Sequence, residues 1–459
     1  MKTRAFLMLS LAPVLWACSN DGSQLALQIR EPTDRRLFAS VDYLELVVAR
    51  DGRTLGQAQF AATAGFLSIP DVTFGANTVV TLDGFSTKSD IVAHGETCAV
   101  DFEAGAQSTS LYFSPTHVFA PTRGAPAAAR SRQVAIPLSD GDVLLLGGFE
   151  NGVATQATTR FSRESGTFVD ALDMALATPR AGAQLTEVSS IGWLITGGVG
   201  ANNVPTATAE LFTEQMGLLS SIENVALGAR RDHGATAIPN DRVVLTGGIS
   251  DAGVTLDTTA VVTLQLNGAA RVTVGPPLKH ARSAHSTVVA VGTPVVIGGF
   301  GPNGDPLSSI EALRLVGNGD VGGFVEIAQL QYARADATAT LLADGAILIV
   351  GGVGATGTLD NAEVYNPITA TTNVYTLATP RRGHTATLLP NGHVLVAGGL
   401  DPSGKPTTSV ELFIPDVGFV SERAMGVAHD GHVAVPLCDG TIIIAGGGAD
   451  AELYTPSPD

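Results

Sequence analysis

The sequence predicts an all-β protein in which a small antiparallel β-sandwich precedes a ring of seven four-stranded β-sheets. Three observations lead to this fold class: a glycine pair that recurs seven times, tight-turn residues shortly before it, and the absence of helical periodicity between the strands. The chain has 459 residues and 53 glycines, which suits a fold with many tight turns. Its length is sufficient for both parts to bury a core.

The repeating unit is clearest in the stretch PRRGHTATLLPNGHVLVAGG, residues 380–399. Two apolar runs, 385–389 and 393–397, flank Asn391-Gly392, which is a strong signal for a two-residue hairpin because both turn positions need positive φ. The runs are therefore predicted to be paired strands, and the second of them ends at Gly398-Gly399.

The same pattern recurs along the chain at spacings of 47 to 53 residues. Strands such as AELF (209–212) and AELYTP (451–456) follow the glycines, and a fourth apolar strand then precedes the next cycle. The glycine pairs are Gly147-Gly148, Gly197-Gly198, Gly247-Gly248, Gly298-Gly299, Gly351-Gly352, Gly398-Gly399 and Gly446-Gly447.

A period near 50 residues with four short strands and a Gly-Gly pair is typical of the kelch class of β-propeller. Residues 114–459 resemble the bacterial kelch-repeat, galactose-oxidase-like propellers, which implies seven blades around a central channel. Kelch units usually carry a Trp in the outer strand, and here Phe or Val stands in that place. Any large apolar side chain can fill the space between blades, so the predicted architecture is unaffected.

The seventh repeat ends before its outer strand, which would leave an open sheet edge. The segment SPTHVFAPT, residues 114–122, precedes the first repeat and belongs to no other blade. We therefore predict that 114–122 completes the last blade and closes the ring.

Residues 1–17 are predicted to be a lipoprotein signal peptide, with Lys2 and Arg4 before an apolar run too short to span a bilayer. Leu15-Trp16-Ala17-Cys18 resembles a bacterial lipobox, although Trp is atypical there, and implies lipidation of Cys18. An ordinary leader cleaved nearby is the alternative. The lipoprotein interpretation places the protein, lipid-anchored, at the bacterial outer membrane or cell surface.

Residues 18–113 contain short strands separated by Gly, Asp and Asn turns, which predicts a β-sandwich of immunoglobulin- or transthyretin-like outline. A spacer near the membrane is the expected role, and a ligand-binding role is the alternative. Cys98 in this part and Cys438 in the last repeat are candidates for a disulfide in an oxidising compartment. Two separate buried thiols are the other interpretation.

The formal net charge of −17 and the lack of a Lys/Arg run argue against nucleic acid and against an anionic lipid surface. We expect a monomer that contacts the membrane only through its lipid anchor. No metal or other cofactor is expected.

An arginine stands 16 or 17 residues before each of the first six glycine pairs, and His429 replaces it in the seventh. One interpretation is an anion-binding ring at the channel mouth, since a guanidinium grips oxyanions bidentately. The other pairs them inside each blade with the Glu of the third strand, an interpretation favoured because a residue present in nearly every blade serves the blade. The arginines are Arg130, Arg180, Arg230, Arg282, Arg334 and Arg381.

Four histidines, His233, His285, His384 and His432, follow this position by three residues and are expected to pack between blades with a hydrogen bond to backbone. Four histidines spread around a ring do not converge as metal ligands must. The sequence shows no catalytic constellation.

We therefore expect a non-catalytic binding or scaffolding module that contacts a protein or a glycan through the loops at the top of the propeller. Those loops are small and poor in the aromatic residues that stack on sugars, which favours a protein. The alternative is a carbohydrate-active kelch-type enzyme, similar to sialate mutarotases, with its site at the channel mouth. Carboxylates with raised pKa values at that mouth would favour the enzyme.

Overall fold

The computed structural model describes residues 14–18, 24–32, 39–62, 75–101, 106–214, 219–223, 227–265, 269–317, 319–448 and 450–458. The described residues form strands and turns and contain no α-helix; they include the 3-10 turn η2 (Leu172–Met174). Accordingly, they include no helix of the length and apolarity needed to cross a membrane. The chain divides into two compact units, the first Met1–Pro121, Pro436–Ile443 and Glu452–Asp459, and the second Thr122–Val435 and Ile444–Ala451.

The first unit contains a five-stranded sheet of order β4-β3-β5-β6-β8 and a three-stranded sheet of order β1-β2-β7. Buried side chains from both sheets, Leu27, Leu46, Val80 and Leu111 among them, share one core, as in a β-sandwich. The strands are β1 (Val14–Cys18), β2 (Gln24–Arg30), β3 (Tyr43–Arg50), β4 (Arg53–Ala61), β5 (Thr78–Phe85), β6 (Ile91–Glu96), β7 (Ala106–Tyr112) and β8 (Ser114–Pro115). β1 consists of residues at the end of the predicted leader, whose removal remains a prediction.

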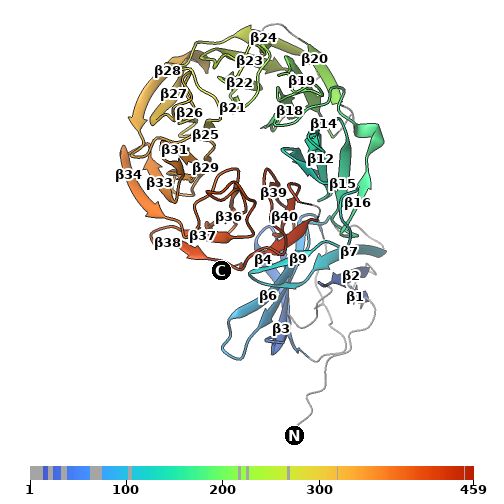
Figure 1. Cartoon of the computed structure of the whole chain (residues 1–459). Coiled ribbons are helices and arrows are strands. Elements are labelled where there is room, and N and C mark those ends of the chain that lie inside the picture. The colour runs from blue at the N-terminus through green and yellow to red at the C-terminus, as the bar shows by residue number, and fades with distance from the viewer. Residues whose placement is uncertain are drawn as a thin grey trace. The chain divides into compact units, whose positions relative to one another are not determined.

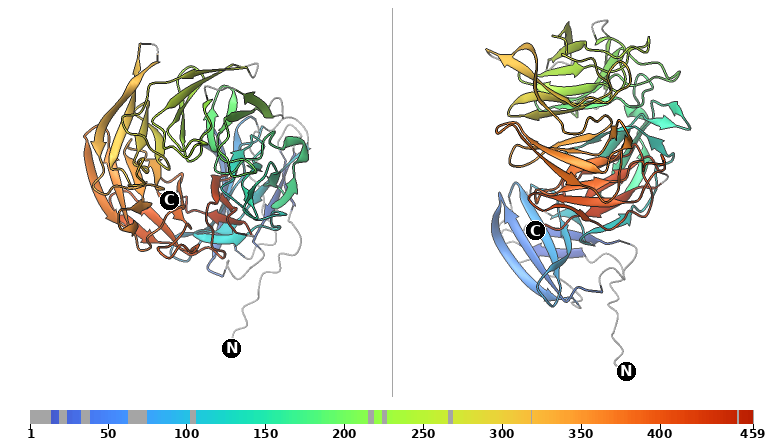
Figure 2. Two further views of the ribbon diagram at one scale, coloured as in Figure 1. Left: turned by 45° about the horizontal axis from the view of Figure 1, so that its top comes forward. Right: turned by 60° about the vertical axis from the view of Figure 1, so that its left-hand side comes forward.

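Four-stranded antiparallel sheets follow one another around a common centre in the second unit, as Figures 1 and 2 show. We call them blades, numbered in chain order, and a kelch-like β-propeller is the fold that they build.

Blades 1 to 3 are β11 (Val134–Pro137), β12 (Val143–Leu146), β15 (Thr158–Ser162) and β16 (Thr167–Asp170); β17 (Gln184–Val188), β18 (Gly192–Thr196), β19 (Thr208–Phe212) and β20 (Leu219–Glu223); and β21 (Gly234–Ile238), β22 (Arg242–Thr246), β23 (Thr259–Leu264) and β24 (Ala270–Val274). Blades 4 to 6 are β25 (Ser286–Ala290), β26 (Thr293–Ile297), β27 (Ser309–Val316) and β28 (Asp320–Gln329); β29 (Thr338–Leu341), β30 (Ile347–Val350), β33 (Asn361–Asn366) and β34 (Thr371–Thr376); and β35 (Thr385–Leu388), β36 (Val394–Ala397), β37 (Val410–Ile414) and β38 (Gly418–Ser421).

Blade 7 is the sheet that takes a strand from far upstream. Its order is β39 (Val433–Pro436), β40 (Ile442–Ala445), β41 (Glu452–Thr455) and β9 (Val118–Pro121), with β9 antiparallel to β41. The segment predicted to supply the missing strand, 114–122, therefore does so through Val118–Pro121. The prediction was too long at its start, because Ser114–Pro115 forms β8 and pairs with β6 instead.

The glycine pairs lie at the seams between blades. At the seam between blades 2 and 3, a Cβ on Gly197 (φ +55°) would lie 2.5 Å from the carbonyl oxygen of Arg230 in the next blade, so no larger residue fits. The next glycine, Gly198, donates its N–H to that same carbonyl at 3.0 Å. The equivalent bond occurs at all seven seams, at 2.8–3.0 Å, and the last one, from Gly447 to Arg130, joins blade 7 to blade 1.

The hydrophobic core of the propeller is a series of clusters between neighbouring blades. Ile136 and Leu144 of blade 1 pack with Ile195 and Phe212 of blade 2, and equivalent clusters join blades 2 to 3, 3 to 4, 4 to 5 and 5 to 6. Each blade buries its sheet faces against its neighbours, as the repeat pattern requires.

Candidate functional site

The six repeated arginines lie inside the blades, with relative exposures of 0–3%. Arg282 is typical: its Nη1 donates to the carbonyl oxygens of Gly298 (2.7 Å) and Ser309 (3.2 Å), and its Nη2 donates to the Ser309 hydroxyl (2.7 Å). A guanidinium whose donors are used in this way has no free edge for a soluble anion. The burial of all six arginines, Arg130, Arg180, Arg230, Arg282, Arg334 and Arg381, favours their structural role within the blades over the predicted anion-binding ring.

Four of these arginines form buried ion pairs with a glutamate of the third strand of their own blade, as the alternative interpretation predicts. Each glutamate also accepts two backbone N–H groups where the chain enters the blade; Glu311 accepts from Lys279 (2.8 Å) and His280 (3.0 Å). The arginine, the glutamate and the incoming backbone thus satisfy one another's charges and hydrogen-bonding groups inside the blade. The pairs are Arg180–Glu210, Arg282–Glu311, Arg334–Glu363 and Arg381–Glu411.

Arg130 and Arg230 differ from the other four. Thr159 stands in place of the glutamate in blade 1, and its hydroxyl accepts a hydrogen bond from Arg130 Nη2 at 2.7 Å. Ala260 stands there in blade 3, and in the described part of the chain no ion pair joins Arg230 to a carboxylate. Burial lowers the pKa of Arg230 to about 10.

The four histidines, which we call the seam histidines (His233, His285, His384 and His432), are buried between blades as expected. Their partner is a threonine hydroxyl of the preceding blade rather than the expected backbone group; His233 Nε2 lies 2.9 Å from Thr196 Oγ1, and the other three pairs have the same distance. Their Nδ1 atoms have no hydrogen-bond partner among the described residues. Burial lowers the pKa of His233 and of His432 to about 3, so these imidazoles are neutral and structural.

The channel mouth is built from the two residues that follow each repeated arginine. The second of them has a left-handed backbone, with φ of +49° to +62°, in every blade. Where hydrogen bonds are present between these residues, each N–H donates to the carbonyl of the equivalent residue in the preceding blade, at 2.6–3.4 Å. We call this circle the mouth ring; its members are Arg132, Gly182, Asp232, Ala284, Asp336, Gly383 and Gly431.

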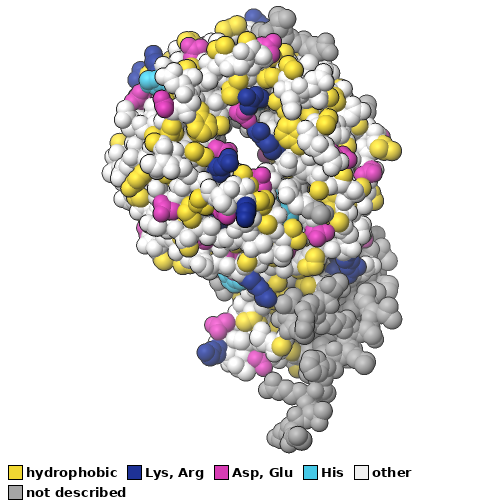
Figure 3. Space-filling model, viewed as in Figure 1, with side chains coloured by type: hydrophobic (Ala, Val, Ile, Leu, Met, Phe, Trp, Pro, Cys, Tyr) yellow, Lys and Arg dark blue, Asp and Glu magenta, His cyan; other side chains and the backbone are white. Residues whose placement is uncertain are grey.

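Three arginines and three aspartates stand on or beside the mouth ring, and we call them the mouth cluster: Arg132, Arg231, Asp232, Asp336, Arg382 and Asp430. The space-filling view shows basic and acidic side chains around the centre of the propeller face (Figure 3). The sequence interpretation missed this cluster because its members do not repeat in every blade. Charged residues at a fixed offset from the repeated arginine were the available signal.

Ion pairs divide the mouth cluster into two halves. Arg132 of blade 1 reaches across blade 2 to Asp232 of blade 3, and Arg231 bonds the same carboxylate at 2.5 Å. In the other half, Arg382 lies 3.8 Å from Asp336, and Asp430 follows in blade 7. The first half therefore carries two cations and one anion, and the second carries two anions and one cation.

The two aspartates of the second half have raised pKa values. For Asp336 the main cause is its enclosure by protein, which exceeds the opposing effects of Arg382 and Arg132; nearby Asp232 and Asp430 raise the pKa further. Enclosure likewise raises the pKa of Asp430, against the same two arginines. The side chain of Asp336 is still 43% exposed, so water and ligands can reach it.

Short loops between the second and third strands surround this mouth. In blades 2, 3, 4 and 6 they share one tight turn; in blade 2, Gly200 donates to the Val204 carbonyl and Asn203 to the Gly200 carbonyl, both at 2.9 Å. The loops of blades 1 and 5 are two-stranded hairpins, β13 (Phe149–Glu150) with β14 (Val153–Ala154) and β31 (Val353–Gly354) with β32 (Gly357–Thr358). Isolated β-bridges connect the loops to the residues that build the mouth, as between Ala181 and Val199 in blade 2. We call the surface that these loops form around the mouth the loop face.

A pocket of about 460 Å³ opens on the loop face between the loops of blades 1 and 2. Asn151 and Asn203 bring amide groups to it from the two loop tips, and Phe149 brings an aromatic ring. Arg130 and Ser131 also line the pocket, and Arg132 of the mouth cluster follows them in the chain. The pocket thus offers an apolar surface, neutral hydrogen-bonding groups and a neighbouring positive charge.

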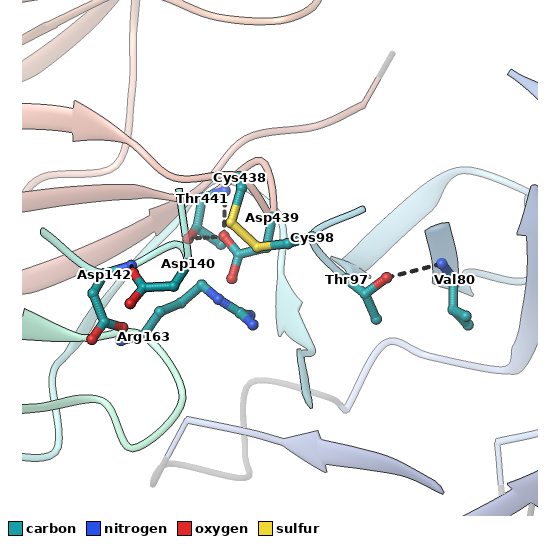
Figure 4. Close-up of a disulfide and its surroundings, with 9 residues drawn as sticks. All are labelled: Val80, Thr97, Cys98, Asp140, Asp142, Arg163, Cys438, Asp439 and Thr441. Atoms are coloured by element: carbon teal, nitrogen blue, oxygen red, sulfur yellow. Dashed lines mark hydrogen bonds between the residues drawn. A yellow bond between two sulfur atoms is a disulfide. The ribbon is translucent and has the colours of Figure 1, made fainter. Parts of the chain in front are cut away.

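Cys98 and Cys438 are joined by a disulfide, with a Cα–Cα distance of 5.0 Å (Figure 4). The two cysteines therefore form the disulfide and are not the two separate buried thiols of the other interpretation. The residue after Cys438, Asp439, accepts hydrogen bonds from the backbone N–H (3.2 Å) and hydroxyl (2.6 Å) of Thr441, which fixes the turn that carries the bridge.

No group of three or more His, Cys, Asp or Glu side chains among the described residues is placed to hold a metal ion. Nothing in the structure describes the side chain of Cys18, so its lipidation stays a prediction.

No family model matches the sequence, and no curated protein is similar to it. Among solved structures, 472 chains are similar, and one of them, titled "Structure of YjhT", is 13% identical with a TM-score of 0.45. That alignment covers 67% of this chain and 98% of the other. At this identity and TM-score the likeness bears on neither ligand nor reaction.

Proposed function

We propose that the protein is a lipid-anchored component of the bacterial outer membrane or cell surface that acts as a non-catalytic binding module. Its ligand, a protein or a glycan, meets the loop face of the propeller. The observation that carries this proposal is the pocket between the loops of blades 1 and 2, which lies beside the mouth cluster. The pocket offers hydrogen-bonding and apolar groups on turns that are already ordered, so binding costs little conformational entropy.

Two further observations support the proposed location. The leader and the Cys18 motif direct the chain across a membrane to a lipid anchor. The disulfide between Cys98 and Cys438 persists only in an oxidising compartment, as outside the cytoplasm. The protein contacts the membrane through the anchor alone and has no nucleic-acid ligand.

Affinity capture from envelope extract, run beside a glycan array, tests the binding role. The immobilised protein is expected to retain one protein or glycan, and Asn202→Ala together with Val204→Ser, both on the blade 2 loop, is expected to reduce that retention. Asn391→Ala, in a turn between the first and second strands, is the control. Equal retention by the loop variant, or no retained ligand, would contradict the proposal.

A carbohydrate-active enzyme is the second candidate, and one observation favours it. Asp336 and Asp430 at the channel mouth have raised pKa values next to Arg132 and Arg382, and a carboxyl group shifted toward neutrality can exchange protons with a sugar hydroxyl. The test is the interconversion of the anomers of free sialic acid, followed by proton NMR. If the protein accelerates this interconversion and Asp336→Asn abolishes the acceleration, the protein is an enzyme. If the protein does not accelerate it, the binding role remains the proposed function.

A further inference from the structure

The loop tips of blades 1, 2 and 3 differ from the others in carrying an exposed valine. Val153, Val204 and Val254 are 51–57% exposed, and they occupy corresponding positions just after the loop turn. Blades 4 and 6 carry Asp305 and Lys405 at that position. Three neighbouring blades thus present an arc of aliphatic side chains, and we call it the valine arc.

The valine arc and the cationic half of the mouth cluster belong to the same blades. Arg132 comes from blade 1 and Arg231 from blade 3, and their side chains are 48% and 39% exposed. The one carboxylate that both contact, Asp232, is only 14% exposed. The accessible surface inside the arc is therefore cationic, although the whole protein is acidic.

The opposite half has the reverse charge. Asp336 and Asp430 stand there with Arg382 between them in the chain, and no valine occupies the loop tips of blades 4 to 6. A ligand that carries a negative charge is attracted to blades 1 to 3 and repelled from blades 5 to 7. The charge distribution therefore orients a ligand as well as attracting it.

We propose that the loop face binds an exposed segment of another protein in which an aliphatic side chain lies next to an acidic one. The aliphatic group covers the valine arc and the mouth of the pocket beside Phe149. The acidic group lies over Arg132 and Arg231. This inference rests on the proposed binding role and names the kind of ligand that fulfils it.

Aliphatic contact and charge contribute differently to such a complex. Valines that are half exposed in the free protein lose water contact on binding, which favours association by the hydrophobic effect. A carboxylate facing two arginines adds orientation and a faster association rate that salt weakens. A glycan has no aliphatic side chain for the arc, so the arc favours a protein segment.

Selection of a random dodecapeptide library on the immobilised full chain tests the proposal. We expect the enriched peptides to share an aliphatic residue near an Asp or Glu. Titration calorimetry then measures the affinity of one selected peptide. Val204→Ser and Arg132→Gln are each expected to weaken it about fivefold to tenfold, an effect in the range of one buried apolar or charged contact.

Two matched variants serve as controls. Val417→Ser changes a valine in the turn between β37 and β38 that is 69% exposed, more than Val204. Arg382→Gln removes a cation from the acidic half. Both variants are expected to change the affinity by less than about twofold. Enriched peptides without acidic residues, an equal effect of Val204→Ser and Val417→Ser, or no enrichment would overturn the inference. If no peptide binds but a glycan is retained through the loop face, the proposed function stands and this inference fails.

Discussion

Acid is expected to unfold the propeller through its four seam histidines. His233 is 1% exposed and bonded to Thr196, and its free Nδ1 would be an unpaired donor in the charged form. Burial, together with the charges of Arg230 and Arg180, lowers its pKa to about 3. In the unfolded chain the same imidazole has a pKa near 6.5.

The sign and size of the effect follow from these values. Because the folded pKa is below the unfolded one, the stabilisation is complete above pH 6.5 and is lost as the pH falls from there toward 3. Between pH 7 and pH 5, each such histidine lowers the free energy of unfolding by about 2 kcal/mol. His233 and His432 together remove about 4 kcal/mol, a large part of the stability of many proteins. Burial also lowers the pKa of His285 and of His384, so these two histidines add to the loss in the same direction.

Carboxylates with raised pKa values act in the opposite direction. Asp336, Asp430 and Glu96 bind a proton more tightly in the folded state, so their contributions rise as the pH falls through their folded pKa values. They therefore offset part of the loss of stability that the histidines cause at acidic pH.

Urea denaturation at pH 5.0 to 7.0, followed by circular dichroism, measures the effect. The free energy of unfolding of the wild type should fall steeply with pH, and His285→Gln should reduce the slope by about 1.4 kcal/mol per pH unit below pH 6, one proton fewer. The slope is the readout, because any substitution here also changes the absolute stability. An unchanged slope, or an NMR titration of His233 near pH 6.5, would show that the seam histidines do not cause the acid unfolding.

Three other predictions concern stability. Arg282→Met leaves Glu311 buried without its cation and should cost about 3–5 kcal/mol in urea denaturation, whereas Arg230→Met, with no carboxylate to orphan, should cost about 1–2 kcal/mol; equal losses would contradict the role of the pair. Replacing both Cys98 and Cys438 by Ser should lower the free energy of unfolding by about 4 kcal/mol, since the bridge closes a loop with a sequence separation of 340; unchanged stability would oppose this. Ala284→Gly should add about 0.5–1 kcal/mol to the free energy of unfolding and so raise the unfolding temperature slightly, because φ at this position is +49°. A lower unfolding temperature would count against strain in the mouth ring.

The repeat architecture could be predicted because local turn chemistry and spacing determine it. Asn391-Gly392 specifies a hairpin, and the glycine pair is required wherever a carbonyl of the next blade approaches, as Arg230 O approaches Gly197. The pairing of Arg282 with Glu311 could also be predicted, since both recur in register.

The functional surface was harder to find because it departs from the repeat. Arg132 occurs in one blade, and Arg231 and Arg382 share a repeat position in only two blades. A search for recurring residues therefore favours Arg130 and its equivalents, which the structure buries. The valine arc likewise depends on which blades are neighbours in space. Nor could spacing decide whether Cys98 and Cys438 meet, because that depends on how distant strands are placed.

A hydrogen-exchange footprint of the ligand retained from envelope extract tests whether the loop face is the binding surface. We expect the ligand to slow exchange in the loops of blades 1 to 3, around residues 149–154, 199–205 and 249–255, and at the mouth cluster. The turns at the other end of the blades, such as 344–346 and 391–393, should exchange as in the free protein. Protection confined to those turns or to residues 39–101 would contradict it.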